Sequence, residues 1–155
     1  MDIIISVNAF FKVKIYEILS SEVLKENSRT YILLKWKGFK FKISKVRVAG
    51  KVLEIRNRGD FWDCTISDNT GNIIMREWNK QGNMLSELHI QDTIDVFALI
   101  REFKNIPYLV PTIITKITIE ALKKRDDEIK LAREAIIRQS SYHHNPQNQK
   151  PSSSR

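Results

Sequence analysis

The chain has 155 residues, of which 42% are hydrophobic, and a formal net charge of +8. This length is sufficient for one domain with its own core and for appended segments. A single cysteine, Cys64, excludes an intramolecular disulfide, and no apolar run has the length of a signal peptide or membrane-spanning helix. We therefore expect an intracellular protein in which Cys64 is a small buried hydrophobe rather than a reactive thiol.

The positive charge is concentrated in the N-terminal part of the chain. Residues 10–58 hold 13 Lys or Arg and four Glu, whereas residues 59–119 hold five Lys or Arg and eight acidic residues. Such a basic segment is typical of nucleic-acid binding, because neutralised phosphates release their counterions. A basic surface that only keeps the protein soluble is the alternative.

Before residue 45 the sequence predicts an extension that packs on a core. We expect extended chain that turns helical from Ile15, a polar loop over residues 25–30, and a hairpin over residues 31–43 with its turn at Lys37 and Gly38. Lysines alternate with aromatic residues in the hairpin, which could serve phosphates and bases together. Lysines also protect exposed edge strands, with the aromatic side chains turned inward. The alternating residues are Lys35, Trp36, Lys37, Phe39, Lys40, Phe41 and Lys42.

Residues 45–78 predict a meander of three antiparallel strands. The first strand is rich in β-branched residues and is interrupted by Gly50, which indicates a bend. In the second strand Trp62, Cys64 and Ile66 alternate with polar positions, the period of a half-buried strand. The turns at residues 57–60 and 67–71 contain Asn, Asp and Gly, which favour tight turns.

Two further strands and a short helix complete a barrel pattern. Residues 79–91 predict a small helix or turn that plugs the end of a sheet, and residues 93–103 and 108–119 predict strands. Pro111 lacks a backbone donor and so indicates a bulge or an edge position. The fold class is therefore mainly β, a five-stranded oligonucleotide-binding (OB) barrel. An SH3-like barrel or a plain meander shares the strand count, but neither is expected to place a plug there.

The C-terminal part predicts one long helix. Residues 120–139 are rich in strong helix formers and lack Pro and Gly. Four residues form a narrow apolar stripe, which meets either a second helix or the chain's own barrel: Leu122, Ile129, Ala132 and Ile136. Residues 140–155 are polar and predict a disordered linker or tail.

These observations divide the chain into an N-terminal extension at residues 1–44, the barrel at 45–119, the helix at 120–139 and the tail at 140–155. The sequence has no phosphate-binding glycine loop and no Cys/His cluster with zinc spacing. Asp60, Asp63 and Asp68 are interpreted as turn and solvent-face groups. We therefore predict no catalytic activity, metal site, cofactor or small-molecule substrate.

Four segments in this order carry a family resemblance: AFFKVKIYEIL from Ala9, YILLKWKG from Tyr31, VRVAGKVLEI from Val46 and FWDCTISDNTGNIIMREW from Phe61. Together they resemble the N-terminal half of Stn, the middle subunit of the CST telomere-capping complex. They are also similar to the middle subunit of replication protein A. The resemblance covers residues 9–137. It departs from the usual pattern at Phe39 and Lys40, where His and Pro are usual, and at Ala98, where the replication protein has glycine.

The resemblance implies a candidate site for single-stranded DNA. Trp78 and Phe103 match aromatic residues that stack on bases, although both could instead be core residues at a barrel end. Arg76 shares a face with Trp78 and could meet a phosphate. Three further cations lie near the loops that line such grooves: Arg56, Arg58 and Lys104.

The resemblance also implies a partner and a location. In both related complexes the helix after the barrel packs on a helix of a small single-barrel partner, which in CST is the Ten subunit. The stripe Leu122, Ile129, Ala132 and Ile136 is therefore the predicted heterodimer interface. We expect a nuclear telomere protein that helps to hold single-stranded DNA at chromosome ends. The alternatives are a replication protein A middle subunit, with general single-strand binding, and a structural adaptor without DNA contact.

Overall fold

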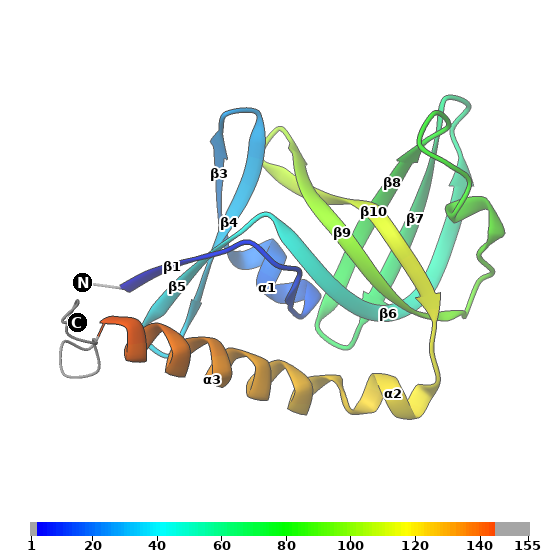
Figure 1. Ribbon diagram of the computed structural model, residues 1–155. Coiled ribbons are helices and arrows are strands. Elements are labelled where there is room, and N and C mark those ends of the chain that lie inside the picture. The colour runs from blue at the N-terminus through cyan, green and yellow to red at the C-terminus, as the bar shows by residue number, and fades with distance from the viewer. Residues whose placement is uncertain (1–2, 145–155) are drawn as a thin grey trace, which may run out of the picture.

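Alternating apolar positions along the chain form a closed five-stranded barrel. The computed structural model describes residues 3–144. The barrel strands are β6 (Lys45–Asn57), β7 (Phe61–Asp68), β8 (Gly71–Trp78), β9 (Thr93–Phe103) and β10 (Ile106–Lys116). β6, β7 and β8 form an antiparallel meander, β9 and β10 form a hairpin, and β10 pairs with β8 in parallel (Figure 1). Pairing of β6 with β9 closes the barrel, which confirms the predicted fold class.

β6 pairs with two other strands of the barrel because it bends at Gly50. Residues 45–51 pair with β9, and residues 51–57 pair with β7. A Cβ atom on Gly50 would lie 2.6 Å from the carbonyl oxygen of Ser67, a backbone atom that cannot move aside freely. Glycine therefore permits the close approach at which the strand changes partner. The predicted bend is confirmed.

The inward faces of the barrel strands are mostly apolar, and most of their residues are buried. Trp62, Cys64 and Ile66 point inward as the alternation predicts, and Cys64 and Ile66 have no exposed surface. The expected irregularity in the last strand is also present, because the register of β10 against β9 shifts between Pro111 and Ile113. A shift of the strand register by one residue would move these apolar side chains to the solvent face, so the alternation fixes the register.

The N-terminal extension forms a second sheet beside the barrel. Its strand order is β1-β5-β4-β3, made of β1 (Ile3–Val7), β3 (Glu22–Glu26), β4 (Arg29–Trp36) and β5 (Phe39–Ile43). β2 (Phe11–Lys12) joins the barrel sheet at β6, and the short helix α1 (Ile15–Ser20) follows it. The hairpin β4–β5 turns at Lys37 and Gly38, as predicted.

The predicted loop at residues 25–30 is wrong. β3 and β4 form a hairpin there, and its turn is made by Asn27 and Ser28, which have φ angles of 52° and 66°. These left-handed angles suit a two-residue hairpin turn. The charged ends of β3, Glu22 and Glu26, hid the strand because an edge strand does not need a continuous apolar face.

A buried carboxylate fixes the plug between β8 and β9. Helix η1 (Leu85–Glu87) is a single 3₁₀ turn, and Leu85 has no exposed surface. Glu77 is 1% exposed and accepts hydrogen bonds from the backbone N–H groups of Met84 at 3.1 Å and Leu85 at 2.9 Å. The predicted plug is confirmed, and its anchor is a charged residue that the apolar pattern did not reveal.

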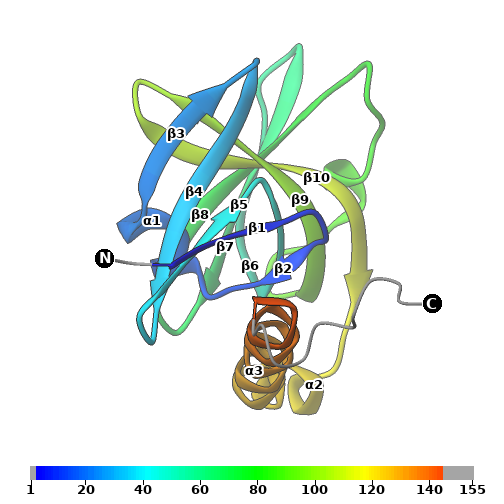
Figure 2. The same cartoon turned by 60° about the vertical axis from the view of Figure 1, so that its left-hand side comes forward.

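The C-terminal segment forms two helices that run beneath the barrel and the second sheet. They are α2 (Ile119–Lys123) and α3 (Arg125–His144); α3 lies below α1 in Figure 1 and below β2 and β6 in Figure 2. Residues 140–144 of the predicted tail are helical, because neither Pro nor Gly interrupts them. The rest of that tail, residues 145–155, lies outside the described residues. Within residues 3–144, no helix is long and apolar enough to cross a membrane.

Candidate nucleic-acid interface

The outer face of β7 and β8 carries two of the predicted site residues, Trp78 and Arg76. Across these strands Phe61 pairs with Trp78, Asp63 pairs with Arg76, and Thr65 pairs with Ile74. Directly paired residues point to the same side of a sheet. These pairs therefore share the outer face, opposite to the face that packs on the core. The register therefore collects aromatic, charged and apolar side chains on one outer surface.

Four planar groups make contact along this surface. The ring centroids of Phe61 and Trp78 are 4.7 Å apart, and the Trp78 side chain is 40% exposed. The Arg76 guanidinium lies 4.4 Å from the centroid of Phe61 and 5.2 Å from that of Tyr108, which β10 supplies. We call Trp78, Phe61, Arg76 and Tyr108 the stacking row. It offers a series of flat faces like those on which unpaired bases stack.

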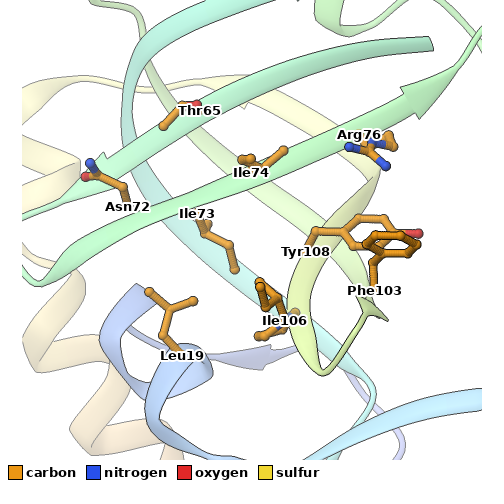
Figure 3. Close-up of a pocket in the computed structure, with 10 residues that line it drawn as sticks. Leu19, Thr65, Asn72, Ile73, Ile74, Arg76, Phe103, Ile106 and Tyr108 are labelled. Carbon is orange, nitrogen blue, oxygen red and sulfur yellow. The ribbon is translucent and has the colours of Figure 1, made fainter.

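A pocket of about 430 Å³ adjoins the stacking row. Ile74 and Arg76 of β8 line one wall, Phe103, Ile106 and Tyr108 line the other, and Leu19 of α1 lies at one end (Figure 3). Phe103 is 64% exposed and Ile106 is 67% exposed. The pocket thus combines exposed apolar walls with one guanidinium, a composition suited to a flat, partly apolar ligand.

Asp63 is buried beneath two of the predicted DNA-binding arginines. It is 7% exposed, its Oδ1 accepts a hydrogen bond from the Nε of Arg76 at 2.9 Å, and its Oδ2 lies 3.5 Å from the Nε of Arg58. The interpretation of Asp63 as a solvent-face group is wrong, because its strand partner is an arginine. Asp68 is also buried, and it accepts a hydrogen bond from the backbone N–H of Ile15 at 2.9 Å.

The remaining predicted residues, Lys104 and Arg56, do not line the pocket. Lys104 forms the β9–β10 turn, and its Nζ lies 5.4 Å from the ring centroid of Phe103. Arg56 pairs with Asp63 across β6 and β7, but its guanidinium donates a hydrogen bond to Glu54 at 2.7 Å. The structure therefore brings Trp78, Arg76 and Arg58 together, and it holds Arg56 in a separate ion pair.

The predicted partner interface on the C-terminal helix is partly occupied by the chain itself. Ile129 is 6% exposed and lines a cleft beside Trp36, so its expected role at a heterodimer interface is corrected. Ile136 packs against the core cluster, and Leu122 and Ala132 are half-buried. Leu131, on another side of α3, is 65% exposed.

The fold and the placement of the pocket define a class of protein. A five-stranded closed barrel with a plug between its third and fourth strands is the OB fold. Here the barrel carries an added N-terminal sheet and a long C-terminal helix. The stacking row lies over its second and third strands, the face on which OB barrels bind oligonucleotides.

Three solved structures share this fold over most of the chain. The S. pombe Stn1–Ten1 complex matches with a TM-score of 0.69 and 14% identity, and the match covers 88% of this chain and 100% of that chain. A replication protein A heterotrimer bound to single-stranded DNA matches with a TM-score of 0.67 and 18% identity, over 83% and 98% of the two chains. Yeast replication protein A bound to single-stranded DNA matches with a TM-score of 0.56 and 21% identity, over 87% and 92%.

At these identities the likeness establishes the fold. The resemblance inferred from the sequence is therefore confirmed at the level of architecture. No protein-family model matches the chain, and no curated protein sequence matches it.

Proposed function

We propose that this chain binds single-stranded DNA along β7 and β8, with bases stacked on Trp78 and Phe103. The observation that carries the proposal is the stacking row, which lies beside a pocket with an exposed phenylalanine at its rim. Stacking of a base on an aromatic side chain contributes about 1–3 kcal/mol and tolerates any base. Flat side chains left exposed on one face are thus explained by a ligand with flat faces of its own.

Substitution of the two exposed aromatic residues tests this proposal. Trp78→Ala and Phe103→Ala should each weaken binding of a fluorescent single-stranded oligonucleotide by about 5- to 150-fold, the equivalent of the stacking free energy. Tyr16→Ala is the matched control, because Tyr16 is 53% exposed on α1 and does not line this pocket. No binding at low salt, or equal binding by all variants, would favour the structural adaptor.

We further propose a telomere-capping role in the nucleus, as a Stn-type subunit that protects chromosome ends without catalysis. The similarity to the S. pombe Stn1–Ten1 complex supports this role, and the similarity to replication protein A bound to single-stranded DNA supports the alternative of general binding. Competition between telomeric-repeat and unrelated oligonucleotides of equal length separates the two. Preference for the telomeric repeat supports capping, and equal affinity supports the general binder.

The proposed partner is a small OB-fold subunit of the Ten type, which binds the C-terminal helix. With Ile129 and Ile136 packed against their own chain, the contact would use the outward side of α3, where Leu131 is exposed, together with the half-buried Leu122 and Ala132. Leu131→Glu should release a co-expressed small subunit during size-exclusion chromatography. Lys130→Glu, a charge change on the neighbouring exposed residue, should not. Co-elution of both variants with the partner would contradict the proposed interface.

A further inference from the structure

We call the stacking row and the adjoining pocket together the groove. It contains a negative charge, that of Asp63, which pairs with two arginines. Asp63 accepts hydrogen bonds from the Nε and Nη2 of Arg76, at 2.9 and 3.5 Å, and lies 3.5 Å from the Nε of Arg58. Its side chain is 10% exposed, whereas that of Arg58 is 45% exposed. One buried carboxylate is thus shared by two guanidiniums at the edge of the proposed DNA site.

The same arrangement uses most of the Arg76 surface. One oxygen of Asp63 holds its Nε, and the rings of Phe61 and Tyr108 contact its guanidinium. A DNA phosphate could pair with this arginine only by displacing Asp63 from a charge-assisted hydrogen bond. The sequence predicted that Arg76 meets a phosphate. The structure instead holds its guanidinium against two rings, as part of the stacking row.

Lys104, beside Phe103, forms no ion pair within residues 3–144. It is exposed at the β9–β10 turn, and its Nζ lies 5.4 Å from the ring centroid of Phe103. The groove therefore combines this lysine with two arginines that share one carboxylate, so Arg58, Arg76 and Asp63 together carry one net positive charge instead of two. Because the salt dependence of binding counts the phosphates that a protein neutralises, this difference is measurable.

We propose that Asp63 is a built-in competitor of DNA phosphates, which makes the groove select unpaired bases by stacking and limits its attraction for polyanions in general. This inference rests on the proposed function, since it assigns the binding mode of the same site. It predicts that wild-type protein binds single strands with a shallow salt dependence. It also predicts that removal of the Asp63 charge converts Arg58 and Arg76 into phosphate ligands.

Asp63→Asn tests the proposal with a side chain of nearly the same shape. Removal of this one negative charge leaves one more positive charge for phosphates, so it should steepen the slope of log affinity against log salt by about 0.7. The loss of affinity between about 50 and about 200 mM salt should then be about threefold greater than in wild type. Asp60→Asn, the same charge change three residues away, controls for net charge and should alter the slope far less.

A second substitution separates charge release from disturbed structure. Arg58→Gln should reduce the slope of the Asp63→Asn protein by about 0.7 and so return it to the wild-type value, because the site then again carries one net positive charge. Lys104→Gln should reduce the slope in both backgrounds. Circular dichroism and a thermal melt establish that each variant is folded before its slope is compared.

The inference and the proposed function can fail separately. Weaker binding by Asp63→Asn with an unchanged slope would overturn the inference, because Asp63 would then only position Arg76. Absence of any binding by wild type would contradict the proposed function. Retention on heparin, an unrelated polyanion, still decides the inference in that case: elution of Asp63→Asn at higher salt than Asp60→Asn supports it, and equal elution overturns it.

Discussion

Cys64 shows how completely the alternation of β7 determines the chemistry of one side chain. It has no exposed surface and lies between Trp62 and Ile66 on the inward face. Burial, together with the neighbouring charge of Asp63, raises the pKa of the Cys64 thiol from 9.0 to about 12. The thiolate is the reactive form, so Cys64 is chemically inert in the folded protein.

The pKa of Cys64 predicts both slow labelling and a loss of stability at high pH. At pH 8 a rise in pKa from 9.0 to about 12 reduces the thiolate population about a thousandfold, so a thiol reagent should label the protein only after unfolding. Above pH 9 the unfolded chain loses this proton first. The free energy of unfolding should therefore fall with rising pH, by at most about 1.4 kcal/mol per unit.

Denaturant titrations at pH 8 and pH 10 measure this effect. Cys64→Val is the control, because it removes the thiol and should remove this part of the pH dependence while Lys and Tyr contributions remain. Rapid labelling of the folded protein, or an identical pH dependence in both proteins, would show that Cys64 is not isolated from water.

The residues of the candidate site could be found from sequence only in part. Trp78 and Phe103 were found by resemblance. Phe61 could have been found by counting, because a turn at residues 68–71 pairs Phe61 with Trp78 once the register is assumed. The position of Tyr108 and the burial of Asp63 could not be found in this way, since they depend on β10 lying beside β8 and on the position of Arg58 within the β6–β7 turn.

At the scale of elements, α3 is attached to the rest of the chain by ion pairs as much as by apolar contact. Arg125, Ile129 and Arg133 recur every four residues, and their exposures are 3%, 6% and 2%. Arg133 donates hydrogen bonds to both carboxylate oxygens of Glu17, each at 2.7 Å, and to the carbonyl of Lys12 at 3.0 Å. Its guanidinium thus fastens α3 to α1 and β2.

Arg125 makes the second attachment, to Asp95 on β9. Its Nη2 lies 2.9 Å from Oδ2 of Asp95, which also accepts hydrogen bonds from Arg47. Burial raises the pKa of Asp95, but hydrogen bonds from Arg47 and Arg125 outweigh it and hold the pKa below 3.8. This contribution to stability is fully present above pH 3.8 and is lost as the pH falls through the folded-state pKa.

Arg133→Met should destabilise the protein by about 3 kcal/mol, because it leaves Glu17 without its partner in a largely buried site. Adding Glu17→Gln should recover part of the loss, since the unpaired charge is then removed. The measurement is denaturant unfolding of the wild type, both single variants and the double variant. Strict additivity of the two single effects would mean that the ion pair contributes nothing to the docking of α3.

Hydrophobic periodicity could not have revealed this docking. The pattern placed Ile129 and Ile136 on one side of a helix, but an apolar stripe does not include Arg125 and Arg133, which lie on that same side. A buried arginine is stable only where partners lie in the fold, and Glu17 is 116 residues away from Arg133 in the sequence. Sequence patterns that score every charged residue as exposed therefore misplace such positions.

At the scale of the whole molecule, the basic N-terminal segment is largely balanced by acids from other elements. Lys14 pairs with Asp126 at 3.0 Å, Lys42 pairs with Glu26 at 2.5 Å, and Arg47 pairs with Asp95 at 2.7 Å. The charge count along the chain predicted a patch, whereas folding uses much of that charge to join strands and helices. The candidate DNA site lies instead on β7, β8 and the β9–β10 hairpin.

The N-terminal sheet and the barrel share one hydrophobic core. Ile32, Leu34, Phe41 and Ile43 of the N-terminal sheet belong to the same buried cluster as the barrel residues. Burial of each such side chain stabilises the fold by about 1.5–3 kcal/mol, and an isolated barrel would expose that surface. The boundary drawn at residue 44 separates two patterns in the sequence but does not separate two cores.

The shared core predicts that the extension and the barrel unfold together. Trp36 of β4 and Trp62 of β7 both pack against the common cluster, so each reports on its own sheet. A Trp62→Phe/Trp78→Phe variant leaves Trp36 as the fluorophore, and a Trp36→Phe/Trp78→Phe variant leaves Trp62. After correction for the stability of each variant by circular dichroism, both fluorescence transitions should coincide with the loss of secondary structure. A Trp36 transition at clearly lower denaturant than the circular dichroism transition of the same variant would mean that residues 1–44 unfold as a separate unit.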